Sequence, residues 1–167
     1  MGVDPGSAVT GFGVVERRPG LSLIAAGTIR PGAMDRGPAR LAIIYQCLLE
    51  AIDQHRPEAI SLERSFVAIN VQSAFRLGEA RAMAMLAAAH RGLELFEYTP
   101  TDVKLSIAGH GRADKAQVKY MVGRTLEAAA VAQMPDDAAD ALAVALCHLF
   151  RMKLPAGVES RMARRAT

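Results

Sequence analysis

Four acidic residues stand at the start or end of regular segments in otherwise small or apolar surroundings. They are Asp4, Glu63, Asp137 and Asp140. Carboxylate oxygens are hard ligands, and the sequence clusters no histidine or cysteine beside them, so the set indicates magnesium or manganese rather than zinc. Two such ions about 4 Å apart would suit phosphodiester hydrolysis, one activating water and the other stabilising the leaving oxygen.

Two of the acids also have an ordinary structural explanation. Asp4 in Asp4-Pro5-Gly6-Ser7 is a common turn residue, and Asp137 near a helix N-terminus is favoured by the helix dipole. Asp140 is harder to explain in this way, because a carboxylate in an otherwise apolar helix is costly unless it is paired or metal-bound. Asp137 and Asp140 share one helix face, so a cation would relieve their repulsion. The residues alone leave a metal site and a structural ion pair open.

Short strands and amphipathic helices must position these acids. Turn residues at Asp4-Pro5-Gly6-Ser7 and Pro19-Gly20 divide the first 29 residues into three successive antiparallel strands, the last two over 9–16 and 21–29. Two further strands are predicted over 59–63 and 93–98. Because Asp4 and Glu63 stand at the C-terminal ends of their strands, we expect adjacent parallel strands to bring them together, where α/β sheets form sites.

Helices alternate with the later strands. Apolar spacing of i, i+3, i+4 and i+7 predicts a helix over 39–54, and composition predicts long packed helices over 71–90 and 136–150, with Gly78 as a point of close approach. Thr99-Pro100-Thr101-Asp102 begins another helix with Thr99 as its N-cap. A glycine loop over 108–112 separates it from a helix that opens near Ala113. The order indicates an α/β fold with a mixed sheet and helices on both faces.

The length fits a single domain, and the mild positive charge is compatible with a polyanionic partner but does not require one. A chain of 167 residues with a net charge of +3 and a pI near 9.1 is mildly basic. One basic group could meet phosphates: Lys104, Arg112, Lys115 and Lys119. We expect a domain over 1–150 and a basic tail over 151–167 whose order is left open. Cys47 and Cys147 lack metal-ligand spacing, and no signal peptide or membrane span is evident, which together predict reduced thiols in a cytoplasmic protein.

Four motifs, in order, resemble the RuvC family of Holliday junction resolvases. They are Asp4-Pro5-Gly6-Ser7, Val9-Thr10-Gly11-Phe12-Gly13-Val14, Leu62-Glu63-Arg64-Ser65-Phe66 and Asp137-Ala138-Ala139-Asp140-Ala141-Leu142-Ala143. The resemblance runs from Asp4 to about Phe150. It implies an RNase H-like fold and a homodimer that makes paired symmetric nicks in a four-way DNA junction, leaving 5′-phosphate and 3′-hydroxyl ends. It also implies a Mg²⁺ or Mn²⁺ requirement, with two ions per active site, and cooperation with RuvA and RuvB.

The resemblance assigns roles residue by residue. Asp4, Glu63 and the pair on the last helix match the family's catalytic and metal-binding acids, and Lys104 and Lys115 match basic residues near the scissile phosphate. Phe66 matches an aromatic residue used at the junction centre, and the helix over 71–90 is the expected dimer contact. Without the resemblance, the lysines would be interpreted as exposed helix residues. The polar neighbours of Phe66 favour an exposed ring, with core packing as the alternative. His110 and His148 are given no catalytic role.

One departure and three rival functions remain open. Only Met1 to Val3 precede Asp4, whereas the family's first strand is usually longer, so either the strand is short or the natural N-terminus lies upstream.

Sugar kinases and actin-like ATPases share a similar opening turn, but they need two such lobes to enclose a nucleotide, and this chain supplies only one. A YqgF-type nuclease acting on RNA and a protein that binds branched DNA without cutting it are the closer alternatives.

Overall fold

Five strands form one mixed sheet in the order β3-β2-β1-β4-β5. The computed structural model describes residues 1–32, 34–35, 37–64 and 71–152. The strands are β1 (Gly2–Asp4), β2 (Thr10–Arg17), β3 (Leu21–Ile29), β4 (Ala59–Glu63) and β5 (Glu94–Tyr98). β1, β2 and β3 pair antiparallel, whereas β4 pairs parallel to both β1 and β5. The predicted antiparallel opening and the mixed sheet are therefore confirmed.

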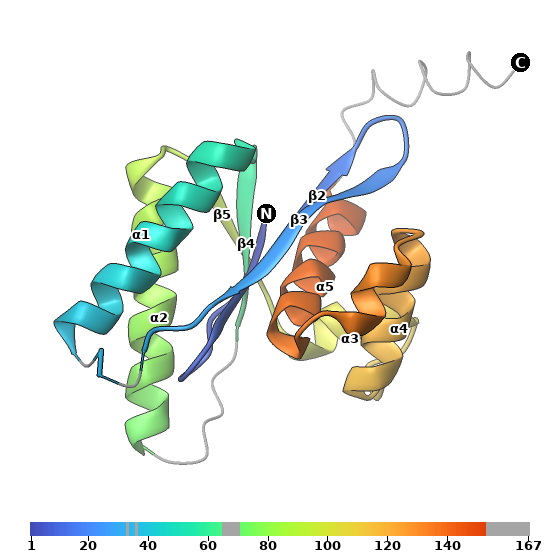
Figure 1. Ribbon diagram of the computed structural model, residues 1–167. Helices are drawn as coiled ribbons and strands as arrows, with labels where there is room; N and C mark the ends of the chain where they lie inside the picture. The colour runs from blue at the N-terminus through green and yellow to red at the C-terminus, as the bar shows by residue number, and fades with distance from the viewer. Residues whose placement is uncertain (33, 36, 65–70, 153–167) are drawn as a thin grey trace, which may run out of the picture.

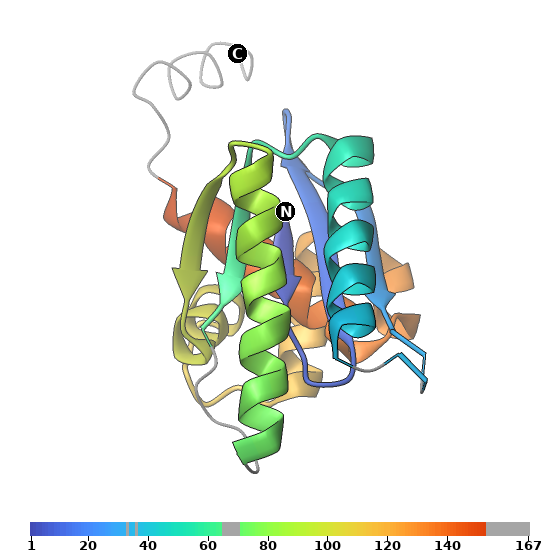
Figure 2. The same ribbon diagram turned by 90° about the vertical axis from the view of Figure 1, so that its left-hand side faces the viewer.

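Helices cover both faces of this sheet, as the order of elements predicts (Figure 1). One face carries α1 (Pro38–His55) and α2 (Val71–His90), which lie side by side in front of the strands in Figure 2. The other face carries α3 (Pro100–Ala108), α4 (Lys115–Thr125) and α5 (Asp136–Arg151). The sequence did not predict the short 3-10 helix η1 (Ala129–Gln133), and α4 begins two residues later than expected.

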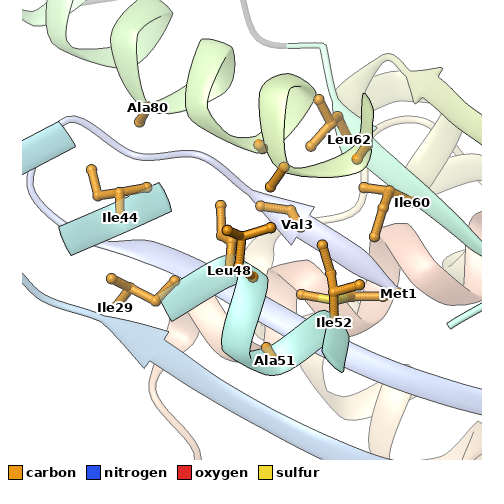
Figure 3. Close-up of a cluster of buried hydrophobic side chains, with 14 of the residues drawn as sticks. Met1, Val3, Ile29, Ile44, Leu48, Ala51, Ile52, Ile60, Leu62 and Ala80 are labelled. Atoms are coloured by element: carbon orange, nitrogen blue, oxygen red, sulfur yellow. The ribbon is translucent and has the colours of Figure 1, made fainter. Parts of the chain in front are cut away.

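The core between the sheet and α1 follows from the apolar spacing of that helix. Ile44, Leu48 and Ile52 are almost fully buried and meet Val3 of β1 and Ile60 of β4 (Figure 3). Burying a side chain of this size stabilises a fold by about 1.5–3 kcal/mol. This cluster fixes β1 and β4 next to each other, and so it fixes the strand ends that carry Asp4 and Glu63.

Glycines let α5 approach the opposite face of the sheet at backbone distance. A Cβ atom on Gly11 of β2 would lie 1.9 Å from the carbonyl oxygen of Asp137, and one on Gly2 would lie 2.1 Å from that of Ala141. Any larger side chain at these positions would push the helix away. The small residues of β1 and β2 therefore set the position of the first turns of α5 relative to the end of β1.

The first half of α2 differs from the packed helix that the sequence predicts. Its buried residues are Ala80, Ala84, Ala87 and Ala88, none of which lies among the first nine residues of the helix, while Phe75 is 70% exposed. The N-terminal end of the helix projects past the strand ends, where the sheet cannot cover it (Figure 2). Gly78, expected at a close approach, faces open space: a Cβ atom added there would meet no atom of another segment within 4 Å.

Two further expectations concern the whole chain. Cys47 and Cys147 are free thiols, as their spacing predicts. None of the helices in the described ranges combines the length and apolarity needed to cross a bilayer.

Candidate active site

Asp4 and Glu63 lie side by side at the C-terminal ends of two parallel strands. The register pairs Val3 of β1 with Leu62 of β4, and Asp4 and Glu63 are the next residue of each strand. Both side chains are half-buried. The expectation that strand pairing would bring these two acids together is confirmed.

The first turns of α5 bring the second pair of acids to the same strand ends. Asp136 and Asp137 lie in the first turn, after Pro135 at the N-cap position, and Asp140 follows one turn later. The side chain of Asp140 is only 20% exposed and lines a cleft together with Asp4 and Glu63. Asp137 does not line that cleft, but its charge acts on Asp4.

Burial and mutual repulsion disfavour the charged form of Asp4. Loss of solvent raises the pKa of Asp4 to about 7, and the negative charges of Glu63, Asp140 and Asp137 add to the effect in that order. Lys115 opposes them. The four acids are therefore close enough to interact electrostatically, and a cation bound among them would favour the ionised form of Asp4.

Two lysines face these acids across a cleft of about 350 Å³. Lys104 of α3 and Lys115 of α4 line it, with apolar walls from Pro100, Val103, Val118 and Ala143. The Lys115 ammonium donates a hydrogen bond to Asp140 Oδ2 at 3.0 Å. This bond, together with the attraction of Asp140, raises the pKa of Lys115. The cleft thus combines acids that attract cations with ammonium groups that attract phosphate.

The donor chemistry of the cleft suits a hard divalent cation. Its acidic lining consists of carboxylates, with no histidine or cysteine among the lining residues. Within the described ranges, however, no three histidine, cysteine or acidic side chains are close enough to hold a metal ion. The residues fit a magnesium or manganese site, but the carboxylates must draw closer together around the ion.

Helix caps explain how the two lysines are aimed. Thr99 and Asp102 form a capping box at the start of α3, as the sequence predicts. Asp114 and Gln117 form a second one at the start of α4, with Gln117 N donating to Asp114 Oδ1 at 2.8 Å. The second box makes Lys115 the first residue of α4 and turns it toward α5. The spacing of Asp114 and Gln117 was a signal from which this start could have been found.

The structure does not bring every candidate residue to the cleft. Arg112 is exposed and does not line it. The Lys119 ammonium donates to the carbonyl oxygen of Met134 at 2.6 Å and to Asp136 Oδ1 at 2.8 Å, so it fastens α4 to the start of α5. Phe66 lies outside the described residues.

Neither histidine that the sequence set aside lines the cleft. His110 is exposed in the loop before α4. His148 is buried on α5, and its Nδ1 shares a hydrogen bond with the Tyr98 hydroxyl at 2.8 Å. Burial lowers the pKa of His148, which favours the neutral ring.

A cluster that the sequence did not reveal lies directly behind Glu63. Arg81 of α2 donates to the carbonyl oxygen of Glu63 at 3.4 Å and forms an ion pair with Glu97 of β5. Arg64 Nε lies 3.8 Å from the same Glu97 carboxylate. Since these residues come from three separate elements, no local pattern marks them. The cluster holds the end of β4, and therefore Glu63, against α2 and β5.

Comparison with known proteins identifies a consistent group of relatives. The family model described as crossover junction endodeoxyribonuclease RuvC matches residues 1–148. The protein of that name from Pelotomaculum thermopropionicum is 49% identical over 152 residues, covering 89% of this chain and 90% of the relative. The one from Alkalilimnicola ehrlichii is 45% identical, covering 93% of each.

Solved structures agree with the sequence relatives. A structure described as T. thermophilus RuvC in complex with Holliday junction substrate superposes with a TM-score of 0.82 at 33% identity, covering 89% of this chain and 91% of the other. The yeast mitochondrial Holliday junction resolvase Ydc2 superposes with a TM-score of 0.60 at 12% identity, covering 98% and 81%. The latter is a likeness of fold alone. The expected RNase H-like fold is confirmed.

Proposed function

This chain belongs to the RuvC family of crossover junction endodeoxyribonucleases, and on that premise we propose that its residues 1–150 form a nuclease domain that resolves four-way DNA junctions. It is a Holliday junction resolvase that hydrolyses phosphodiester bonds in recombination and repair. The observation that carries this function is the meeting of Asp4, Glu63 and Asp140 in one cleft with Lys104 and Lys115. The basic tail over 151–167 lies outside the proposed domain.

Enzymes of this family depend on divalent metals, and we assign Mg²⁺ or Mn²⁺ to the carboxylates, with two ions per site. Asp4, Glu63, Asp137 and Asp140 would hold them, since these are the hard oxygen donors at the strand ends and on α5. When bound, the ions supply an activated water and charge stabilisation at the leaving oxygen. The near-neutral pKa of Asp4 means that this side chain must give up a proton to become a ligand.

The remaining cleft residues act on the phosphate. Lys104 and Lys115 bind the non-bridging oxygens of the scissile phosphate and stabilise the charge that develops there. Before a metal ion binds, Asp140 keeps Lys115 protonated and oriented through their hydrogen bond. Water attacks in line, so that each nick leaves a 5′-phosphate and a 3′-hydroxyl, with no covalent bond to the protein.

Outside the cleft, two more residues are assigned to DNA. Phe66, three residues after Glu63, stacks on an unpaired base at the junction centre. Arg112, exposed in the loop before α4, meets a more distant phosphate. Lys119 would have to release Met134 and Asp136 before it could bind DNA, so we assign it to holding α4 in place.

A homodimer would supply the two active sites that paired nicks require. The exposed apolar residues of α2 offer the surface for it, because Val71, Phe75, Met85 and Leu86 lie along one side of the helix. We further propose that the dimer works with RuvA and RuvB on chromosomal DNA in the cytoplasm.

A gel assay tests the proposed function directly. The full chain is incubated with a synthetic four-way junction, or with a linear duplex of matching sequence, in the presence of Mg²⁺, Mn²⁺ or EDTA. We expect symmetric, metal-dependent nicking of the junction alone. Binding without cutting in every condition would indicate a junction-binding protein, and cutting of RNA in preference would indicate a YqgF-type nuclease.

A further inference from the structure

The contact between Lys115 and Asp140 places an ammonium group among the acids that would hold a divalent ion. Lys115 Nζ lies 3.0 Å from Asp140 Oδ2, inside the cleft that Asp4 and Glu63 also line. The negative charges of Asp4 and Glu63 also raise the pKa of Lys115. The same carboxylates that would attract a metal ion therefore attract the Lys115 ammonium, and the two cations would compete for Asp140.

The two partners differ in how easily they can move. The Lys115 side chain is 77% exposed, whereas that of Asp140 is 20% exposed on a helix packed against the sheet. A long, exposed lysine side chain can swing aside at little energetic penalty, because surface ion pairs of this kind are weak. The backbone of Asp140, in contrast, is fixed by its helix, and its side chain is shorter and more buried. Separation of the pair would thus move the ammonium further than the carboxylate.

Lys104 provides a natural comparison within the same cleft. It also carries a positive charge and lines the cleft, but within the described ranges it forms no ion pair. A general electrostatic effect on metal binding should therefore appear at both lysines. Direct competition for a ligand oxygen should appear only at Lys115.

We propose that Lys115 is an exchangeable internal cation. Its ammonium stays bonded to Asp140 until a divalent ion binds that carboxylate, and the ion then displaces the ammonium, which turns toward the phosphate of the DNA. Metal loading and phosphate binding are then coupled, because Lys115 becomes available to the phosphate only when the ion has bound Asp140. This inference rests on the proposed metal-dependent function. It adds a role for Lys115 before DNA is bound.

Metal affinity measured without DNA separates this role from catalysis. Mn²⁺ is titrated into the full chain at low ionic strength, and the free ion is followed by its electron paramagnetic resonance signal. We expect Lys115→Met to bind Mn²⁺ about fivefold more tightly than the unaltered chain, the range expected for removing one ion pair of this exposure. Lys104→Met should change the affinity by less than about twofold. Lys115→Arg keeps the charge and should not tighten binding.

The outcomes distinguish failure of this inference from failure of the metal site. Equal tightening in Lys115→Met and Lys104→Met, or tightening in Lys115→Arg, would overturn the exchange. If Asp140→Asn binds Mn²⁺ as well as the unaltered chain does, the proposed metal site itself is wrong. Lys115→Gln, whose amide can still bond Asp140, replaces Lys115→Met if circular dichroism in EDTA shows that the latter is unfolded.

Discussion

Raising the pH from about 6 to about 8 should tighten divalent-metal binding roughly tenfold, because Asp4 must lose a proton to become a ligand. Its burial between the sheet and α5, beside three other acids, raises its pKa to about 7. Bound metal requires the ionised carboxylate. The apparent affinity should therefore follow the ionised fraction of Asp4 in the protein before metal is added.

The expected size follows from that pKa. At about pH 6 roughly one Asp4 in eleven is ionised, and at about pH 8 roughly ten in eleven are, which is a tenfold ratio or about 1.4 kcal/mol of binding free energy. Below the pKa the affinity should fall about tenfold for each pH unit, and above it the affinity should level off. Proton release on binding should decrease from nearly one per protein to nearly none over the same range.

Isothermal titration calorimetry with Mg²⁺ or Mn²⁺ measures both quantities, if each pH is repeated in two buffers of different ionisation enthalpy. Asp4→Asn is the control: it should bind metal more weakly and lose the pH dependence and the proton release around pH 7. An affinity that does not change between about pH 6 and about pH 8, or proton release that survives in Asp4→Asn, would refute the assignment to Asp4.

The same shift predicts how stability changes with pH before metal is added. The folded-state pKa of Asp4 lies above the ordinary value of 3.8, so the ionised form is disfavoured by folding. The protein is therefore relieved of this penalty at low pH, and Asp4 should lower the free energy of unfolding as the pH rises from about 4 to about 7, by up to about 4 kcal/mol. Urea melts in EDTA should show a loss in the unaltered chain that is reduced in Asp4→Asn.

Three further substitutions test separate parts of the site. Asp140→Asn should abolish junction cleavage while leaving junction binding on native gels within about twofold, since it removes a metal ligand without changing the shape of the side chain. Loss of folding instead would mark Asp140 as structural. Gly11→Ala should lower the free energy of unfolding by about 2–3 kcal/mol or more in urea melts, because the added methyl group pushes α5 from the sheet. Gly20→Ala is the control and should be near neutral, because Gly20 has open space around it. Equal effects of the two substitutions would contradict the proposed packing. Lys104→Met should reduce the slope of log affinity for the junction against log salt concentration by about 1. Lys119→Met should leave that slope unchanged and lower the melting temperature, because Lys119 joins α4 to the start of α5. The reverse pattern would place Lys119 on the DNA.

The regular elements could be predicted closely because their signals are local. The predicted range of α2 matches the observed one, and those of β3 and β4 do as well. α1 is longer than its expected range by one residue at each end, and α5 by one residue at its C-terminal end. Periodicity, turn residues and caps act over a few neighbours, so each element can be recognised without its partners.

The sequence was less informative where burial depends on other elements. It predicted a packed helix over 71–90, but the first half of α2 projects beyond the sheet, and Phe75 is exposed. The same residue types build a buried helix or an interface helix. Only the length of the neighbouring strands determines which residues are covered.

By itself the sequence determined which acids could carry the chemistry and that Asp4 and Glu63 would meet, because strand order and strand ends fix that meeting. Only the tertiary structure decided where three of the four basic residues lie and what they contact. Lys115 binds Asp140, Lys119 binds Met134 and Asp136, and Arg112 stays outside the cleft, although all three looked alike in the chain. Their separation depends on the packing of α4 against α5, and that packing depends in turn on how closely the glycines of β1 and β2 let α5 approach the sheet. Contacts of this kind join segments distant in sequence, so no local pattern records them.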